Sequence, residues 1–295
     1  MNSTSSHPAP FPSFLSLTTP CLLLLLLLLV LPSPSSAATV NKVAFNQMVD
    51  AHLVSLYEDF FKYSEQVKAM RGTPPEEPTM AALIQKLQTV SARLVHAQFG
   101  PPPHRVLLSL EFPASMPEVQ ERGREGHLVI EMAPLETMPH AVAVFLDMVR
   151  RWNGGAFHRN AGHVLQVAVQ DAITPDPDHR LAPLNFPRPT LAFQEYNATY
   201  PHVKYTLGFA GRLGGPAFYI NTIDNTKNHG PGSQGSATEA DSCFGRVLTK
   251  KDEVMVEWMR QQPGGSGRNS FIEDKANHIK IVAAHVLKEN ERLPL

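Results

Sequence analysis

Apolar side chains recur every three or four residues along two stretches near the start of the chain. They are Phe45, Val49, Leu53, Leu56, Phe60, Tyr63, Val67 and Met70 in the first stretch, and Met80, Leu83, Leu87, Val90 and Leu94 in the second. This spacing puts them on one face of a helix, and a breaker-rich turn at 71–79 separates the stretches. We predict an α-helical hairpin stem over residues 41–98. Its apolar faces would pack against each other, the following domain or a second copy of the chain.

From residue 104 the pattern changes to short β-rich runs separated by turns. Eight such runs lie at 106–112, 127–132, 156–159, 163–169, 205–211, 217–222, 243–248 and 278–284. Helical spacing returns at 139–150 and 251–261. Eight strands with few helices favour a barrel or sandwich over a doubly wound α/β fold, and a barrel leaves no exposed edges. The predicted fold class is therefore mainly β: an eight-stranded antiparallel closed barrel over 104–290 with two capping helices, preceded by the stem.

The beginning of the chain contains an uninterrupted apolar segment. Residues 21–31 are CLLLLLLLLVL, which is shorter than the roughly 20 residues that a bilayer core of about 30 Å requires. The pattern Ser36-x-Ala38 is typical of a cleavage site. We predict that residues 1–38 form a signal peptide or a retained N-terminal membrane anchor, and both alternatives stay open. Either one directs the chain to the secretory-pathway lumen (ER or Golgi) or outside the cell, and the glycosylation sequon at Asn197 fits that setting.

The amino-acid composition argues against some classes of partner and some kinds of site. The 26 basic and 27 acidic side chains leave a net charge of −1, which gives no reason to expect nucleic acid or an anionic membrane surface as a partner. The two cysteines are Cys21 and Cys243, and the first lies in the leader. A disulfide framework and a cysteine-rich zinc site are therefore excluded. Membrane contact is expected only through the possible anchor, and the stem is a possible site of oligomerisation.

Three short motifs follow one another in a distinctive order within the predicted barrel. Phe157-His158-Arg159 is followed by Gln166, then GPAFYI at 215–220, then FGRV at 244–247. In this order and spacing, residues 104–290 resemble the cyclophilin-type peptidyl-prolyl cis-trans isomerase domain. The likeness is greatest to the divergent secretory cyclophilin-like proteins of algae and other protists, because GPAFYI is similar to the family's Gly-Ser-Gln-Phe-Phe-Ile and FGRV to its Phe-Gly-Lys-Val.

The resemblance implies roles for individual side chains. Arg159 takes the place of the family's catalytic arginine, and Gln166 that of the glutamine that bonds the substrate backbone. The other substrate-binding candidates implied by the resemblance are Ala210, Tyr219, Phe218, His163, Val164 and Phe244. A guanidinium suits this reaction because it is always charged and offers several fixed donors to a prolyl nitrogen. No metal or cofactor is required, and the expected partners are proline-containing polypeptide segments.

The groove also departs from the family pattern. The segment between Arg159 and Gln166 is one residue short, so His163 or Val164 takes the place of a family phenylalanine. Other family groove residues are replaced by Gly211, Ala217 and Asp241. Two functions therefore remain open. One is a prolyl isomerase of reduced rate that assists folding of secreted proteins, and the other is an inactive cyclophilin-like module that binds Pro- or Gly-containing segments of lumenal proteins.

Two further sequence features bear on function. A long polar loop at 221–241 is of the kind that is often functional beside a barrel mouth. Asp176-Pro177-Asp178, together with an anchor and stem, suggests a third class, a Golgi glycosyltransferase. That motif lies in a proline-rich loop without a nucleotide-binding α/β pattern, which argues against the class. His158, His163 and Asp171 have no metal-ligand spacing, so no metal site is predicted.

Overall fold

The structure is a computed structural model that describes residues 34–170, 188–212, 214–237, 239–265, 269–288 and 291, with side chains described from residue 51. The predicted leader run at 21–31 and the Asp176–Asp178 motif lie outside the described residues. By its internal contacts the chain divides into two compact units, Met1–Val49 and Asp50–Leu295. Among the helices within the described ranges, none combines the length and the apolar character needed to cross a bilayer.

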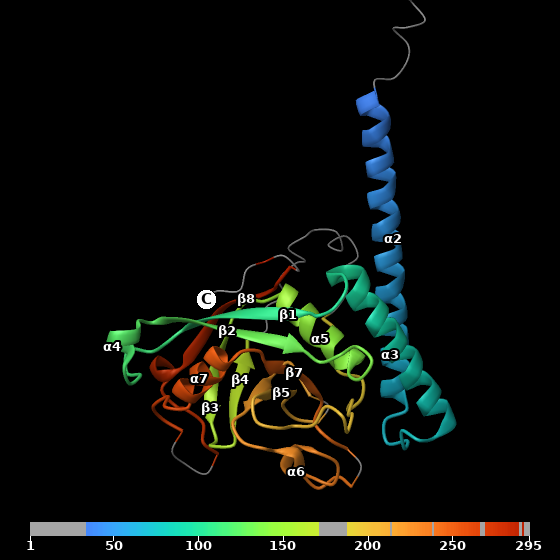
Figure 1. The fold of residues 1–295 in the computed structure, drawn as a ribbon. Helices are drawn as coiled ribbons and strands as arrows, with labels where there is room; N and C mark the ends of the chain where they lie inside the picture. Colours follow the sequence, from blue (N-terminus) through green and yellow to red (C-terminus); the bar gives the residue numbers. More distant parts are fainter. Residues whose placement is uncertain are drawn as a thin grey trace, which may run out of the picture. The chain divides into compact units, whose positions relative to one another are not determined.

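Eight antiparallel strands close into a barrel (Figure 1), which confirms the predicted barrel. Their order around the barrel is β1-β2-β7-β5-β6-β4-β3-β8. The strands are β1 (Arg105–Glu111), β2 (Glu125–Met132), β3 (Gly155–Asn160), β4 (Val164–Val169), β5 (Thr206–Phe209), β6 (Phe218–Asn221), β7 (Cys243–Val247) and β8 (Ile279–Val286). Each overlaps one of the eight predicted runs, because turn-separated apolar and β-branched segments favour a pleated, buried backbone.

Two longer helices pack on the barrel where helical spacing predicts them. Helix α5 (Pro139–Arg150) contacts β7 and β8, and α7 (Lys250–Met259) contacts β2. Pro139 suits the first turn of α5 because that position needs no backbone donor. Thr249 and Asp252 form a reciprocal capping box at the start of α7. The short elements α4 (Val119–Arg122), α6 (Thr226–His229) and the 3-10 turn η2 (Lys275–Asn277) were not predicted.

The barrel core is centred on four aromatic rings. Phe145 of α5 lies 4.3 Å from Phe244, 5.3 Å from Phe218 and 6.3 Å from Phe209, measured between ring centroids. All four side chains are fully buried. Helix α5 therefore contributes Phe145 to the aromatic core of the barrel and also packs against its strands.

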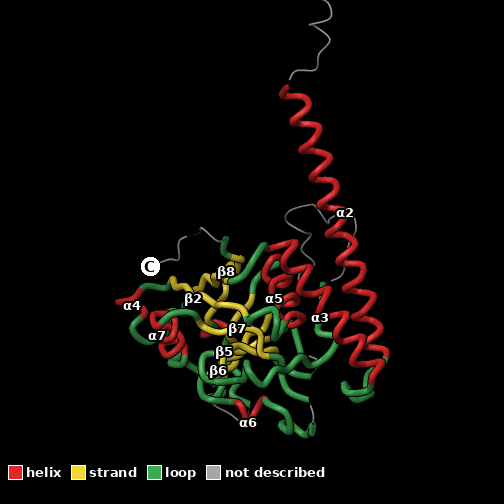
Figure 2. Tube along the Cα trace, turned by 45° about the vertical axis from the view of Figure 1, so that its right-hand side comes forward, coloured by secondary structure: helices red, strands yellow, loops and turns green. Residues whose placement is uncertain are grey.

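Helices α2 (Pro34–Ala69) and α3 (Pro78–Phe99) occupy the region predicted as a hairpin. Glu77 caps α3 by accepting a 3.0 Å hydrogen bond from the Met80 backbone. Helix α3 lies beside α5 (Figure 2), and Tyr57 of α2 donates to Asp147 of α5 over 2.8 Å. Of the three predicted packing partners, the structure provides two for these helices: the following domain, and the other helix of the pair, since the Tyr57 hydroxyl also lies 3.1 Å from Gln98 of α3. The predicted boundary between stem and domain falls within the second compact unit.

Candidate functional site

A bulge in β3 sets the direction of Arg159. The register with β4 runs from Phe157 opposite Val167 to Arg159 opposite Gln166, so His158 is the extra residue. A bulge redirects the side chains that follow it. Arg159 and Gln166 consequently face the same side of the barrel wall, and Nη1 of Arg159 donates to Oε1 of Gln166 over 2.9 Å.

Two further contacts hold the guanidinium. Nε of Arg159 donates to the Asn269 carbonyl over 2.8 Å, and the Phe271 ring centroid lies 5.5 Å from its Cζ atom. Within the described part of the chain, no carboxylate forms an ion pair with Arg159. Its hydrogen bonds go to a neutral amide and a backbone carbonyl, so neither partner neutralises its positive charge.

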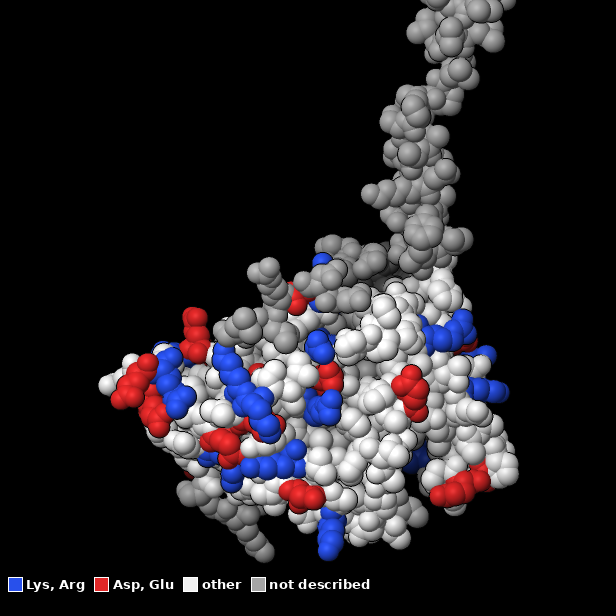
Figure 3. All heavy atoms as spheres, in the orientation of Figure 1, with Lys and Arg blue, Asp and Glu red and all other residues white. Residues whose placement is uncertain are grey.

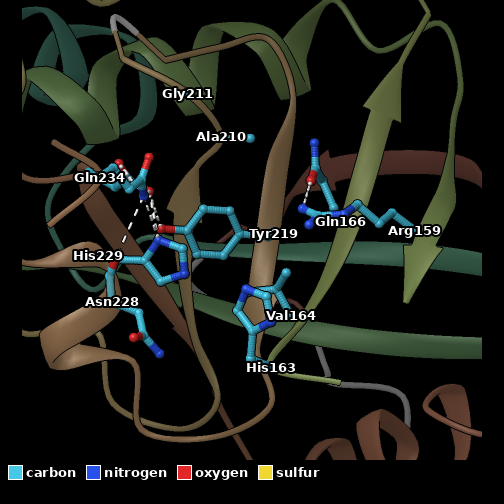
Figure 4. Close-up of a pocket in the computed structure, with 11 residues that line it drawn as sticks. Arg159, His163, Val164, Gln166, Ala210, Gly211, Tyr219, Asn228, His229 and Gln234 are labelled. Atoms are coloured by element: carbon cyan, nitrogen blue, oxygen red, sulfur yellow. Dashed lines mark hydrogen bonds and ion pairs between the residues drawn. The ribbon is translucent and has the colours of Figure 1, made fainter. Parts of the chain in front are cut away.

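A pocket of about 580 Å³ opens beside Arg159 (Figure 4). Six of the predicted catalytic and substrate-binding residues line it: Arg159, His163, Val164, Gln166, Ala210 and Tyr219. They come from β3, β4, β6 and the ends of adjoining segments, which the closed barrel places side by side. The barrel therefore assembles most of the predicted set around one cavity.

The other named residues lie elsewhere. Phe218 and Phe244 belong to the core cluster with Phe145 and are not among the pocket residues. Strand side chains alternate between the two faces of a sheet, so Phe218 and Tyr219 point in opposite directions. Asn197, the sequon residue, lies in a half-exposed turn where its Oδ1 accepts hydrogen bonds from Thr199.

A buried polar cluster that the sequence did not predict lies beside the pocket. The carboxylate of Asp241 accepts hydrogen bonds from His229 Nδ1 at 2.8 Å, from the Tyr219 hydroxyl at 2.9 Å and from Arg212 Nε at 3.2 Å. Gln234 also contacts this carboxylate. The pocket is also lined by Gly211, Asn228, His229, Gln234 and Asp241. The resemblance placed Gly211 and Asp241 at groove positions, whereas the only signal for Asn228, His229 and Gln234 was their place in the polar 221–241 loop.

Burial and charge shift the pKa values in this cluster. Burial alone would raise the pKa of Asp241, but the hydrogen bond from His229, together with those from Tyr219 and Arg212, holds it below its usual value. Burial, and then the charge of Asp241, raises the pKa of Tyr219 well above its usual value. Burial lowers the pKa of the neighbouring His202 to about 4. At neutral pH the cluster therefore contains an ionised Asp241 bonded to a neutral phenol.

Gly208 of β5 leaves space for the side chains of Tyr219 and His202. A Cβ atom at this position would lie 2.7 Å from the Tyr219 hydroxyl and 2.7 Å from His202 Cε1. Real Cβ atoms do not approach other heavy atoms so closely, so only glycine lets Tyr219 and His202 lie across the strand.

Comparisons with known proteins add no identification. No family model matches the chain, and no curated protein matches its sequence. Among the described residues, no group of three or more His, Cys, Asp or Glu side chains has an arrangement that could hold a metal ion. The geometry of the pocket is therefore the basis for a functional assignment.

Proposed function

We propose that the barrel is a cyclophilin-like peptidyl-prolyl cis-trans isomerase and that Arg159 is its catalytic residue. The observation that carries the proposal is the guanidinium itself. It lies at the edge of a pocket of about 580 Å³, bonded to Gln166 and to a backbone carbonyl rather than to a carboxylate.

The proposed chemistry uses only this donor and the shape of the pocket. Prolyl isomerisation has a barrier of about 18–20 kcal/mol because amide resonance is lost as the bond twists. The lone pair of the prolyl nitrogen then becomes available to an N–H donor. Two of the five N–H groups of Arg159 are used in the bonds to Asn269 and Gln166. The others can bond to the twisted amide more strongly than to the planar one, which lowers the barrier.

The pocket has both apolar and polar lining residues, which suit the ring and the backbone of a prolyl segment. Val164 and Ala210 are the aliphatic residues that line the pocket, while Gln166 can bond a substrate backbone beside Arg159. The reaction forms no covalent intermediate and involves no cofactor or metal. We further propose that the clients are proline-containing segments of lumenal or extracellular proteins, on the basis of the leader pattern and the Asn197 sequon.

A second function is binding without turnover. The observation that favours it is the Tyr219–Asp241–His229 cluster, which puts a bonded phenol and an imidazole where an apolar ring pocket is expected. On the face drawn in Figure 3, basic and acidic side chains are interspersed, so this face offers a peptide no extended surface of one charge. Specificity in this case would come from the pocket.

Exchange NMR on a labelled Ala-Pro peptide distinguishes the two functions. Added to the full chain, the peptide should show accelerated interconversion of its cis and trans resonances if the protein is an isomerase. Shifted resonances without faster interconversion would support the binding module. Unchanged positions and unchanged interconversion would contradict both functions.

A further inference from the structure

The His229–Asp241 pair leaves one imidazole nitrogen without a partner at the pocket. The carboxylate of Asp241 is nearly inaccessible to solvent and lies 2.8 Å from Nδ1 of His229. An ionised carboxylate can only accept hydrogen bonds, so Nδ1 carries the imidazole proton. In the neutral ring, Nε2 is then an acceptor with a free lone pair.

Nothing within the described part of the chain donates to that lone pair. His229 is buried, and its Nε2 has no hydrogen-bond partner. The ring contacts Tyr219 at 4.7 Å and the neighbouring His163 at 5.9 Å between centroids. Nδ1 of His163 lies 3.0 Å from the Ala161 carbonyl and therefore donates to it, so the second imidazole has no proton to offer when neutral.

Nε2 of His229 belongs to a residue that lines the proposed prolyl site. His229 lines the same pocket as Arg159 and Gln166. Figure 4 shows the His229 ring with one edge at the dashed bonds and the opposite edge toward His163. A buried acceptor without a donor is unfavourable, and a ligand that supplies the donor removes that cost.

We propose that His229 Nε2 accepts a hydrogen bond from the bound peptide, so that the pocket selects prolyl segments whose proline adjoins a side chain with an O–H or N–H donor. This inference rests on the proposed function, because it assumes that a prolyl segment occupies the pocket. Arg159 and Gln166 would hold the peptide backbone, and His229 would discriminate among the residues next to proline.

Binding of matched peptides to the full chain tests this selection. Three peptides differ only in the residue beside proline: alanine has no side-chain donor, serine has an O–H and asparagine has an N–H. Calorimetry should give about tenfold tighter binding for at least one donor peptide than for the alanine peptide. The comparison of serine with asparagine then identifies the donor.

Two ring substitutions provide the matched variants. His229→Phe keeps an aromatic ring against Tyr219 but removes the acceptor, so it should abolish the preference while the alanine peptide still binds. His285→Phe makes the same change on β8, outside the residues that line the pocket, and should keep the preference. A nitrogen NMR spectrum of the wild-type imidazoles is a separate check: the Nε2 resonance of His229 should move on adding the preferred donor peptide and not on adding the alanine peptide.

The outcomes separate this inference from the proposed function. Equal affinity for all three peptides, or a preference that survives in His229→Phe, overturns the role of His229 while leaving prolyl binding intact. If no prolyl peptide binds to the wild-type chain, both the role of His229 and the proposed function are lost.

Discussion

Two buried titratable side chains near the start of α5 make the stability of the fold depend on pH in opposite directions. Glu195 accepts hydrogen bonds from the Ala141 backbone at 2.7 Å and from Gln88 at 2.9 Å, and burial raises its pKa to about 7. Burial lowers the pKa of His140 to about 3. The neutral imidazole accepts from the Ala192 backbone at 3.0 Å. Each group is thus held in its neutral form by the fold.

The pH dependence follows from the signs of these shifts. A raised carboxyl pKa means that the folded state binds the proton more tightly, so the contribution of Glu195 is lost as the pH rises toward 7. A lowered imidazole pKa means that the contribution of His140 is lost as the pH falls below its ordinary value of 6.5. We expect Glu195→Gln to remove a decline of at most about 1.4 kcal/mol per pH unit in the free energy of unfolding between about pH 5 and pH 7.

Chemical denaturation at a series of pH values measures this effect. Glu136→Gln is the matched control, because Glu136 lies exposed just before α5 and its replacement should leave the pH profile unchanged. An identical pH slope in the wild type and in Glu195→Gln would show that the buried carboxyl does not titrate as its surroundings indicate.

Helices α2 and α3 form hydrogen bonds with α5 through buried polar side chains. Asp147 of α5 accepts from the Tyr57 hydroxyl at 2.8 Å and forms ion pairs with Arg150 and Arg151 at 2.9 Å each. Ser91 of α3 lies 3.2 Å from Nδ1 of His140. These contacts make residues 50–69 of α2, together with α3, a component of the folded unit rather than a detached spacer.

Tyr57→Phe tests the strength of that connection. The substitution keeps the ring and removes one donor to a buried carboxylate, which should lower the free energy of unfolding by about 1–3 kcal/mol. Tyr63→Phe on the same helix is the control. Its ring packs at the edge of the core near Lys62 and Lys86, and within the described part of the chain its hydroxyl forms no hydrogen bond, so we expect a change below about 0.5 kcal/mol. Equal effects of the two substitutions on urea denaturation would contradict the proposed role of the Tyr57 bond.

At the scale of the whole molecule, stability depends on one aromatic core shared by α5 and the strands. Phe145→Ala removes the ring that contacts Phe209, Phe218 and Phe244, and should cost about 3–5 kcal/mol. Val254→Ala, at a position 59% exposed on α7, should cost far less. Thermal unfolding of both variants provides the comparison, and a small shift for Phe145→Ala would contradict the central position of its ring.

The barrel and its two main helices were predictable because their signals are local. Strand runs, turn residues and the helical spacing at 139–150 need no knowledge of distant contacts. The pairing of Arg159 with Gln166 follows from a bulge that no local pattern marks. The bonds of Asp241 to His229 and Tyr219 join residues from a loop and a strand, so they emerge only when the barrel closes. Strict alternation along β6 could have separated Phe218 from Tyr219.

The most direct test of the account is the rate of prolyl isomerisation by the full chain and by Arg159→Ala. Exchange NMR at equal protein concentrations should show accelerated interconversion with the wild type, with at least a hundredfold loss in the variant, on the order expected for removal of a transition-state donor. Arg159→Lys should recover only part of the rate, because an ammonium lacks the fork that reaches Gln166 and the amide together. A variant Arg159→Ala that interconverts the peptide as fast as the wild type would contradict the assignment of Arg159.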